Sequence, residues 1–153
     1  MINSIEDFKK FISDKSFKKI FVLCGKKSFV TSGAKENIEK IIIKKEIKFF
    51  YKNFDLPILE ELIELIKDIK NFKPDLILAV GGGTVMDYAK IANVVDVRPD
   101  LSELIKNYSY PFKEKYTKLA VIPTTAGSGA EVTSNAVIYV DGIKHSFESE
   151  LLI

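Results

Sequence analysis

Short, largely apolar runs alternate along the chain with longer segments in which apolar residues recur every three or four positions. The short runs lie at 18–23, 47–51, 75–80 and 119–122. Apolar residues at successive positions are typical of strands that are buried on both faces, as in a parallel sheet. The pattern therefore predicts four strands of this kind.

Two segments between these runs have the rhythm of amphipathic helices. Residues 37–45 place isoleucines at spacings of three and four, and residues 57–72 repeat leucine and isoleucine in the same way, with Pro57 at the expected opening turn. Strands that alternate with helices indicate right-handed crossover units and a sheet covered on both faces. The predicted fold class is α/β: a doubly wound, mostly parallel, Rossmann-like sheet.

The pattern changes near the end of the chain. Residues 135–140 and 143–147 are two β-prone runs, and the Asp-Gly pair between them suits a tight type I′ turn. We therefore expect a C-terminal antiparallel hairpin after the parallel sheet.

Composition limits the kinds of protein that the chain could be. Its 153 residues amount to about one domain, and its net charge of +2 is small for a nucleic-acid binder. The apolar runs are too short to span a membrane, and the first ten residues lack the apolar core of a signal peptide. Cys24 is the single cysteine, so the expected compartment is a reducing cytoplasm. Neither nucleic acid nor a membrane is expected as a partner.

Charge is distributed unevenly along the chain. Lysines outnumber acids between Lys9 and Lys52, whereas acids outnumber bases between Asp55 and Glu103. Amphipathic helices with different solvated faces would produce this asymmetry. A lysine-rich side that attracts an anionic ligand, such as a dinucleotide, would produce it too. Composition leaves both alternatives open.

A glycine turn follows the third predicted strand. Three glycines, Gly81 to Gly83, remove every Cβ between this strand and a helix that we expect to open with Thr84, its hydroxyl acting as a cap and Asp87 standing at capping-box spacing. Main-chain N–H groups at such a helix start form a site for phosphate. A structural tight turn is the alternative. The spacing matches neither G-x-G-x-x-G nor a P-loop, so a P-loop NTPase is disfavoured.

A second polar loop follows the fourth predicted strand. Residues 123–131 read P-T-T-A-G-S-G-A-E, which places the hydroxyls of Thr124, Thr125 and Ser128 at a strand's carboxyl end. Hydroxyl and main-chain N–H groups there suit a pyrophosphate or a ribose. A serine nucleophile would need a base, and the chain's only imidazole, His145, lies in the predicted hairpin, so a hydrolase is disfavoured.

Together the two loops resemble a known family. The segment G-G-G-T-x-x-D-x-x-K, followed about forty residues later by P-T-T-A-G-S-G-A-E, is similar to the iron-containing alcohol dehydrogenases, relatives of dehydroquinate synthase and glycerol dehydrogenase. The resemblance covers nearly the whole chain. It implies an N-terminal dinucleotide-binding domain, here residues 1–153, and a helical domain that holds divalent iron or zinc, which we expect to be missing from this chain. The sequence of the predicted hairpin, V-I-Y-V-D-G-I-K-H-S, is similar to that of phosphonoacetaldehyde reductases within this family.

The resemblance also implies cofactor-binding roles for individual residues. Gly82, Gly83 and Thr84 would bind the pyrophosphate, and Asp87 would face the nicotinamide end. The hydroxyls of the second loop would line the pyrophosphate and the nicotinamide ribose, which Lys144 would approach. Two residues depart from the family: Ser128 commonly is Thr there, which retains a hydroxyl, and Ala130 commonly is Ser, which removes one. No catalytic or metal-binding residue is expected in this chain; His145 is expected at a strand edge near the cofactor cleft.

The turn after the first strand bears on the choice of cofactor. Many relatives carry an aspartate there that accepts from the adenosine ribose, whereas this chain has Gly25, two lysines and Ser28. Cations in place of an acid favour an additional phosphate. We therefore expect NADP(H) to be preferred, with NAD(H) as the second choice, and assign Gly25 and Ser28 to the cofactor site. Cys24 is interpreted as a small residue that fills space at the strand end.

The resemblance implies an oxidoreductase that transfers hydride between NAD(P) and a small alcohol or aldehyde, of which this chain is the cofactor-binding half. Such a half is expected to be inactive alone, and its uncovered apolar surface favours a homo-oligomer. Two alternatives remain open. One is a non-catalytic dinucleotide-binding module, and the other is a domain like those of dehydroquinate synthase or glycerol dehydrogenase.

Overall fold

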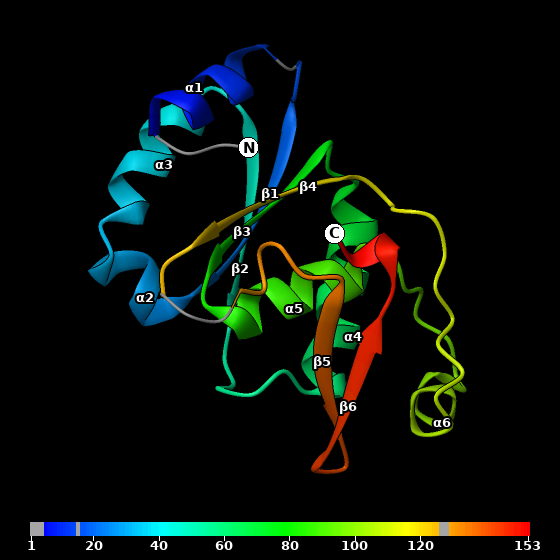
Figure 1. The fold of residues 1–153 in the computed structure, drawn as a ribbon. Helices are drawn as coiled ribbons and strands as arrows, with labels where there is room; N and C mark the ends of the chain where they lie inside the picture. Colours follow the sequence, from blue (N-terminus) through cyan, green and yellow to red (C-terminus); the bar gives the residue numbers. More distant parts are fainter. Residues whose placement is uncertain (1–4, 15, 126–128) are drawn as a thin grey trace.

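A computed structural model describes residues 5–14, 16–125 and 129–153, and Figure 1 shows an α/β arrangement with a separate hairpin. The elements, in chain order, are α1 (Ile5–Asp14), β1 (Lys19–Gly25), α2 (Lys26–Thr31), α3 (Ala34–Ile42), β2 (Glu46–Lys52), α4 (Leu59–Phe72), β3 (Leu76–Gly81), α5 (Gly83–Ala92), α6 (Leu101–Lys106), β4 (Lys118–Pro123), β5 (Asn135–Val140), β6 (Ile143–Glu148) and a 3₁₀ turn (Glu150–Leu152).

The main sheet has four strands in the order β2-β1-β3-β4, and every neighbouring pair is parallel. The expected doubly wound sheet is confirmed. Its register sets Gly25 at the end of β1 opposite Lys52, and Gly81 at the end of β3 opposite Pro123. All four strands therefore end at one edge of the sheet.

Both faces of the sheet are buried, which explains the uninterrupted apolar runs. Phe21 and Leu23 of β1 belong to one core with α4, α5 and the hairpin, whereas Ile20 and Val22 belong to another with α1, α2 and α3. Successive residues of a strand point to opposite faces, so a strand covered on both sides needs apolar residues at each position.

The connections that follow β1 and β3 diverge at the carboxyl edge, and such a switch point is where α/β sheets are expected to form a ligand crevice. The chain leaves β1 through α2 and α3 on one face of the sheet, and it leaves β3 through α5 on the other face. Because β1 and β3 are neighbours, their following segments diverge at this point (Figure 1). Ligands of open α/β sheets bind at such a switch point.

The predicted C-terminal hairpin is confirmed. β5 and β6 pair antiparallel, and the turn residues Asp141 and Gly142 have φ values of 50° and 77°. Two successive positive φ values are those of a type I′ turn, which Asp-Gly favours. The hairpin does not join the main sheet but packs on α5, through Ala136, Ile138 and other buried residues.

The helices differ more from expectation than the strands do. The helix expected at 37–45 spans Ala34–Ile42, and α1, α2 and α6 were not predicted. α2 and α6 have six residues each, too few for an apolar repeat to become visible over two turns. Such short helices are stabilised by packing rather than by their own propensity.

A buried polar network ties the segment after β2 to α5. Glu61 is 2% exposed and accepts hydrogen bonds from the main-chain N–H of Asn53 and from the Tyr88 hydroxyl (2.9 Å). The Tyr88 oxygen in turn accepts from the Ile58 N–H at 2.7 Å. Buried polar atoms of this kind cost free energy when they lose their partners. The network therefore holds residues 53–58 against the helix that begins at the glycine turn.

We expect Tyr88→Phe to lower the free energy of unfolding by about 1–3 kcal/mol, since it leaves the Ile58 N–H and a Glu61 oxygen without their partner. Urea unfolding followed by circular dichroism measures this change. Tyr51→Phe is the matched control: Tyr51 is 38% exposed, and its loss of a hydroxyl should cost about 0.5 kcal/mol or less. Equal stability of the two variants would contradict a role for the network.

Candidate functional site

The glycine turn after β3 has no room for side chains at Gly81 and Gly82. A Cβ on Gly81 would lie 2.5 Å from Val85 Cγ2, and one on Gly82 would lie 2.9 Å from Thr125 Oγ1. Distances this short exclude ordinary side chains without a shift of the neighbours. The second contact also shows that the glycine turn and the loop after β4 touch, although more than forty residues separate them.

The start of α5 lies at this turn. Gly82 is the residue that precedes the helix, and its carbonyl accepts from the N–H groups of Val85 (3.0 Å) and Met86 (3.2 Å). The two N–H groups that precede them in this turn, those of Gly83 and Thr84, have no carbonyl within the helix to bind, and the helix dipole adds partial positive charge there. An anionic group placed beside Gly82 would therefore meet N–H donors and a favourable field.

The expected side-chain cap is wrong. No side chain caps α5, and the Thr84 hydroxyl instead donates to the Asp55 carbonyl at 3.0 Å. The reason is that the helix begins at Gly83, one residue earlier than expected, which puts Thr84 inside the first turn. Thr84 thus joins α5 to the segment after β2 and brings a third strand end to the site.

The loop after β4 is bound to the glycine turn through its main chain. The Thr124 N–H donates to the Gly81 carbonyl at 3.0 Å. The Thr124 hydroxyl oxygen is buried and has no hydrogen-bond partner in the described part of the chain. Buried hydroxyls nearly always have a partner, and for this atom the described residues do not supply one. The predicted site residue Ser128 lies outside the described residues.

The turn after β1 forms the other wall of the crevice. A Cβ on Gly25 would lie 2.8 Å from Ser28 Oγ, so these two predicted site residues are in contact. The Lys26 ammonium donates to Asn53 Oδ1 at 2.8 Å, which connects this turn to the end of β2. Cys24 is fully buried, and burial raises the pKa of its thiol to about 12. A thiol of that pKa is unreactive at neutral pH, which agrees with Cys24 as a space-filling residue.

Asp87 lies one turn into α5, facing the hairpin. Burial raises the pKa of its carboxyl to about 6, against the opposing effects of the Val137 N–H and of the Lys90 and Lys144 charges. The hairpin residue Lys144, predicted to approach a ribose, therefore comes near the carboxylate that was predicted to face the nicotinamide. The structure brings these two distant residues of the sequence to the same side of α5.

Lys90 has a structural role that the sequence did not reveal. It is 3% exposed, and its ammonium donates to the carbonyls of Thr133 (2.6 Å) and Asn135 (3.0 Å). Burial lowers its pKa, whereas Asp87 and Glu131 oppose that shift. Lys90 therefore fixes the chain that leads from the second polar loop into the hairpin. The one available signal was a lysine in an otherwise apolar stretch of helix.

His145 lies on β6, a strand of the two-stranded hairpin sheet, and its side chain is buried. It is 4% exposed, packs on Tyr108 with the ring centroids 5.8 Å apart, and has no hydrogen-bond partner at either nitrogen among the described residues. The β6 side chains at 145 and 147 turn inward, under the segment that follows α6, and this burial is what the sequence did not show.

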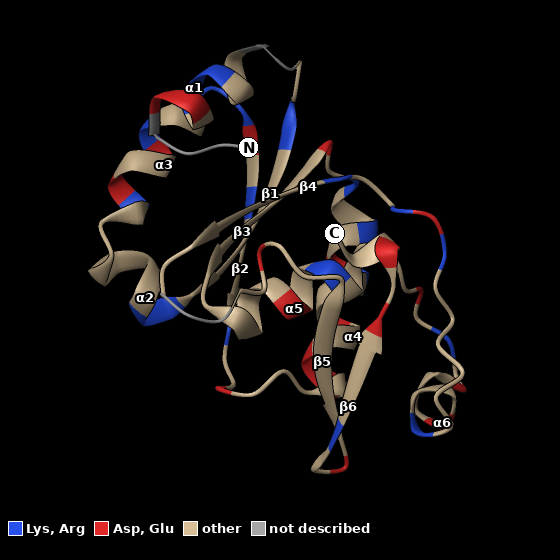
Figure 2. Cartoon of the chain, in the orientation of Figure 1, with Lys and Arg blue, Asp and Glu red and all other residues tan. Residues whose placement is uncertain are grey.

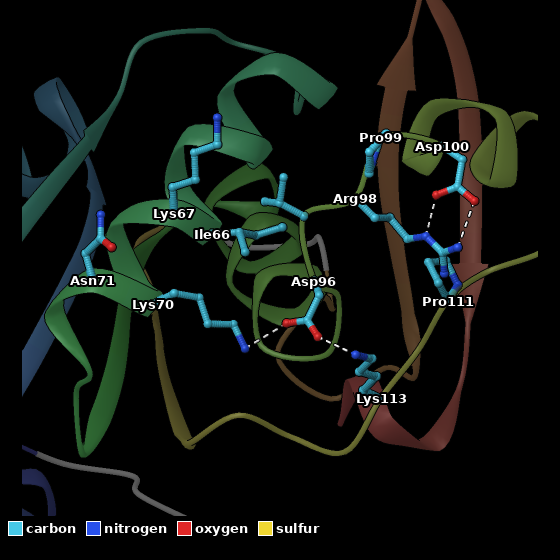
Figure 3. Close-up of a pocket in the computed structure, with 11 residues that line it drawn as sticks. Ile66, Lys67, Lys70, Asn71, Asp96, Arg98, Pro99, Asp100, Pro111 and Lys113 are labelled. Atoms are coloured by element: carbon cyan, nitrogen blue, oxygen red, sulfur yellow. Dashed lines mark hydrogen bonds and ion pairs between the residues drawn. The ribbon is translucent and has the colours of Figure 1, made fainter.

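A separate cleft of about 700 Å³ lies away from the strand ends just described. Lys70 and Lys113 both point at Asp96, and Arg98 pairs with Asp100 (Figure 3). It is formed by the last turns of α4 and by the segments after α5 and before β4. Asp96 and Asp100 are paired with cations of the same cleft. The residues that line the cleft do not include the glycine turn.

The described residues form neither a metal centre nor a helix that could cross a membrane. Residues 5–14, 16–125 and 129–153 contain no group of three or more His, Cys, Asp or Glu side chains placed to hold a metal ion. Within the same ranges, every helix is too short or too polar to span a bilayer.

Comparison with known proteins identifies relatives of this chain. A family model described as iron-containing alcohol dehydrogenase matches residues 2–153. The alcohol dehydrogenase of Thermococcus barophilus is 33% identical over 99 residues, which are 61% of this chain and 26% of that protein. The 4-hydroxybutyrate dehydrogenase of Clostridium kluyveri is 34% identical over 143 residues, 86% of this chain and 35% of that protein. The chain thus spans about a third or less of these relatives.

Solved structures share the fold. The iron-containing alcohol dehydrogenase of Thermococcus thioreducens matches with a TM-score of 0.80 and 25% identity over 99% of this chain and 42% of that one. The sulfoacetaldehyde reductase of Bifidobacterium kashiwanohense, solved in complex with NAD⁺, matches with a TM-score of 0.82 and 22% identity over 97% of this chain and 40% of that one. The second likeness concerns the fold alone.

The raised pKa of Asp87 predicts a pH-dependent stability. Because the folded state holds this proton more tightly than a carboxyl with the ordinary pKa of 3.8, stability is lost as the pH rises from about 4 through about 6. Asp87→Asn removes that loss. Urea unfolding at pH 4 and pH 8 should therefore show the variant gaining about 1–3 kcal/mol on the parent protein at the higher pH. A constant difference between the two proteins would contradict a buried carboxylate, since all other titrating groups are common to both.

Proposed function

This chain belongs to the iron-containing alcohol dehydrogenase family, and we propose that it is the part of an NAD(P)-dependent oxidoreductase that binds the dinucleotide. The carrying observation is the contact between the glycine turn and the second polar loop, where a Cβ on Gly82 would lie 2.9 Å from Thr125 Oγ1. That contact lies at the switch point of a parallel sheet, the place where such folds take their ligands.

The cofactor pyrophosphate would lie against the start of α5. Gly82, Gly83 and Thr84 would present main-chain N–H groups to its oxygens, and the absence of side chains at the glycines would let the phosphates approach closely. The Thr84 hydroxyl keeps its bond to the Asp55 carbonyl in this arrangement. Its contribution is therefore to hold the segment after β2 beside the phosphates.

The nicotinamide end would lie toward the hairpin. Thr124, whose buried hydroxyl has no partner among the described residues, would donate to the cofactor, and Thr125 would line the pyrophosphate beside it. Lys144 would approach the nicotinamide ribose, and Asp87 would face the ring. Ser128, which lies outside the described residues, is proposed for the same group of hydroxyls.

The cofactor would be NADP(H) in preference to NAD(H). The support is the turn after β1, where Gly25 and Ser28 stand with two exposed lysines and no acid. Figure 2 shows positive charge at the start of α2. Cations near the adenosine ribose attract a further phosphate, whereas an acid would repel it.

When bound, the nicotinamide supplies the site that accepts or donates hydride in the oxidation of a small alcohol or the reduction of an aldehyde. The residues of this chain would bind and orient that cofactor. Divalent iron or zinc is assigned to a second, helical domain, as the resemblance implies, because the described residues do not form a site that fits it. The proposal includes a reducing cytoplasm, in keeping with the buried free thiol of Cys24. It also includes a homo-oligomer.

Gly83→Val is expected to abolish dinucleotide binding, because a branched side chain would occupy the place where the phosphates approach α5. Fluorescence titration with NADPH measures the loss, which we expect to exceed a hundredfold. Ala34→Val is the matched control, since Ala34 is the first residue of α3 just as Gly83 is the first residue of α5. Unchanged affinity in a folded Gly83→Val protein would reduce the glycine turn to a structural role.

Turnover separates an oxidoreductase from a module that only binds a dinucleotide. The chain is incubated with NADPH, a panel of small aldehydes, and Fe²⁺ or Zn²⁺, and the absorbance of NADPH is followed. We expect binding without turnover from these 153 residues, and turnover when the same sequence is part of a protein as long as its relatives. Binding without turnover in the longer protein would favour the non-catalytic module.

A further inference from the structure

We propose that Lys52, the last residue of β2, is the central cation of a subsite for the 2′-phosphate of NADP(H). The inference rests on the proposed dinucleotide function and adds a residue that neither motif contains. Lys52 determines, on this account, which of the two nicotinamide dinucleotides the protein prefers.

The sheet register places Lys52 at the crevice. Lys52 is paired with Gly25, where β1 ends and the predicted cofactor turn begins. A Cβ on Gly25 would lie 2.8 Å from Ser28 Oγ and 3.8 Å from Lys52 Cε. The serine hydroxyl and the lysine side chain therefore flank the same point, although one comes from α2 and the other from β2.

Two further lysines lie around this point. Lys26 is held by the bond from its ammonium to Asn53 Oδ1, at 2.8 Å, which joins the turn after β1 to the end of β2. Lys27 follows it and is exposed at the start of α2. The start of α2 thus brings two lysines and the Ser28 hydroxyl to the strand end opposite Lys52.

The nearby acids are placed so that they do not cancel this charge. Dinucleotide folds that select NAD carry an acid near the end of the second strand to accept from the ribose 2′-hydroxyl, and here that position is held by Lys52 and Asn53. Glu61 is buried, with both oxygens engaged by Asn53 and the Tyr88 hydroxyl. Glu39 lies on α3, on the same face of the sheet as α2, and its charge raises the pKa of Cys24 and Tyr51. Lys52, two residues after Phe50, belongs to the opposite face of β2.

Asp55 is the one exposed acid in the segment that follows β2. Its carbonyl accepts from Thr84, which ties its main chain to the start of α5, on the pyrophosphate side. An Asp55 carboxylate that reached the ribose would favour NAD, so this residue is the competing determinant that an experiment must separate from Lys52.

The Lys52 ammonium would exchange one hydrogen bond to a neutral carbonyl for bonds to the phosphate. It donates to the Phe54 carbonyl at 2.7 Å, a neutral acceptor two residues away on the same strand end. A phosphate dianion is a stronger acceptor for an ammonium than a carbonyl is. Binding of the 2′-phosphate would therefore draw the Lys52 side chain a short distance into the crevice without disturbing the sheet.

The test compares dissociation constants of NADP⁺ and NAD⁺ for the parent chain, Lys52→Met and Lys48→Met, by calorimetric titration at one salt concentration. Lys48 is the matched control, because it lies on the same strand and its ammonium pairs with Asp68 on α4 at 3.0 Å. We expect Lys52→Met to lose about tenfold in NADP⁺ affinity, with NAD⁺ affinity unchanged within about twofold. Lys48→Met should change neither.

Two further measurements sharpen the result. Adenosine 2′,5′-bisphosphate should compete for the parent site better than ADP, and Lys52→Met should remove that advantage. Lys52→Glu should reverse the preference toward NAD⁺, because it places an acid where the 2′-hydroxyl lies. Circular dichroism of each variant establishes that it is folded.

The outcomes that overturn the proposal differ from those that overturn the proposed function. An unchanged ratio of NADP⁺ to NAD⁺ affinity in Lys52→Met, or an equal loss of both cofactors by the folded variant, overturns the role of Lys52. The role of Lys52 is also overturned if the parent chain prefers NAD⁺ and Asp55→Asn removes that preference. That result would assign selectivity to Asp55. A parent chain that binds neither dinucleotide overturns the proposed function itself.

Discussion

The site depends on one steric constraint: there is no room for side chains where β3 passes into α5. Gly81 faces Val85, and Gly82 faces Thr125, at distances that a Cβ would make too short. Because the glycines are bare, the start of α5 and the loop after β4 can touch, and main-chain N–H groups remain open to a ligand. The remaining polar groups of the site are arranged around this contact.

The charged residues differ between the two sides of the site. Lysines gather where β1 and β2 end, and of the acids around them Glu61 is engaged in buried hydrogen bonds whereas Asp55 is exposed. On the hairpin side the order is different: Asp87 and Lys144 come near each other beside α5. NADP(H) carries its extra phosphate on the adenosine ribose at one end and the nicotinamide at the other, with the pyrophosphate between them, so this asymmetry would suit the proposed cofactor.

Strands were easier to predict from the sequence than helices, because burial on both faces leaves an uninterrupted apolar run. All four parallel strands and the hairpin turn were recovered within a few residues. The helices α2 and α6 were missed, since six residues do not show a repeat. The prediction of a cap at Thr84 was wrong because α5 begins one residue earlier than expected. No local pattern encodes that shift.

The sequence by itself determined the fold class, the glycine turn and the second polar loop, because each depends on residues that are neighbours along the chain. Only the tertiary structure decided which distant residues share the crevice. Lys52 meets Gly25 through sheet register, Thr84 meets Asp55 through the buried network around Tyr88, and His145 is buried by a segment nearly forty residues earlier. Register and packing set these contacts, and neither is written in local spacing.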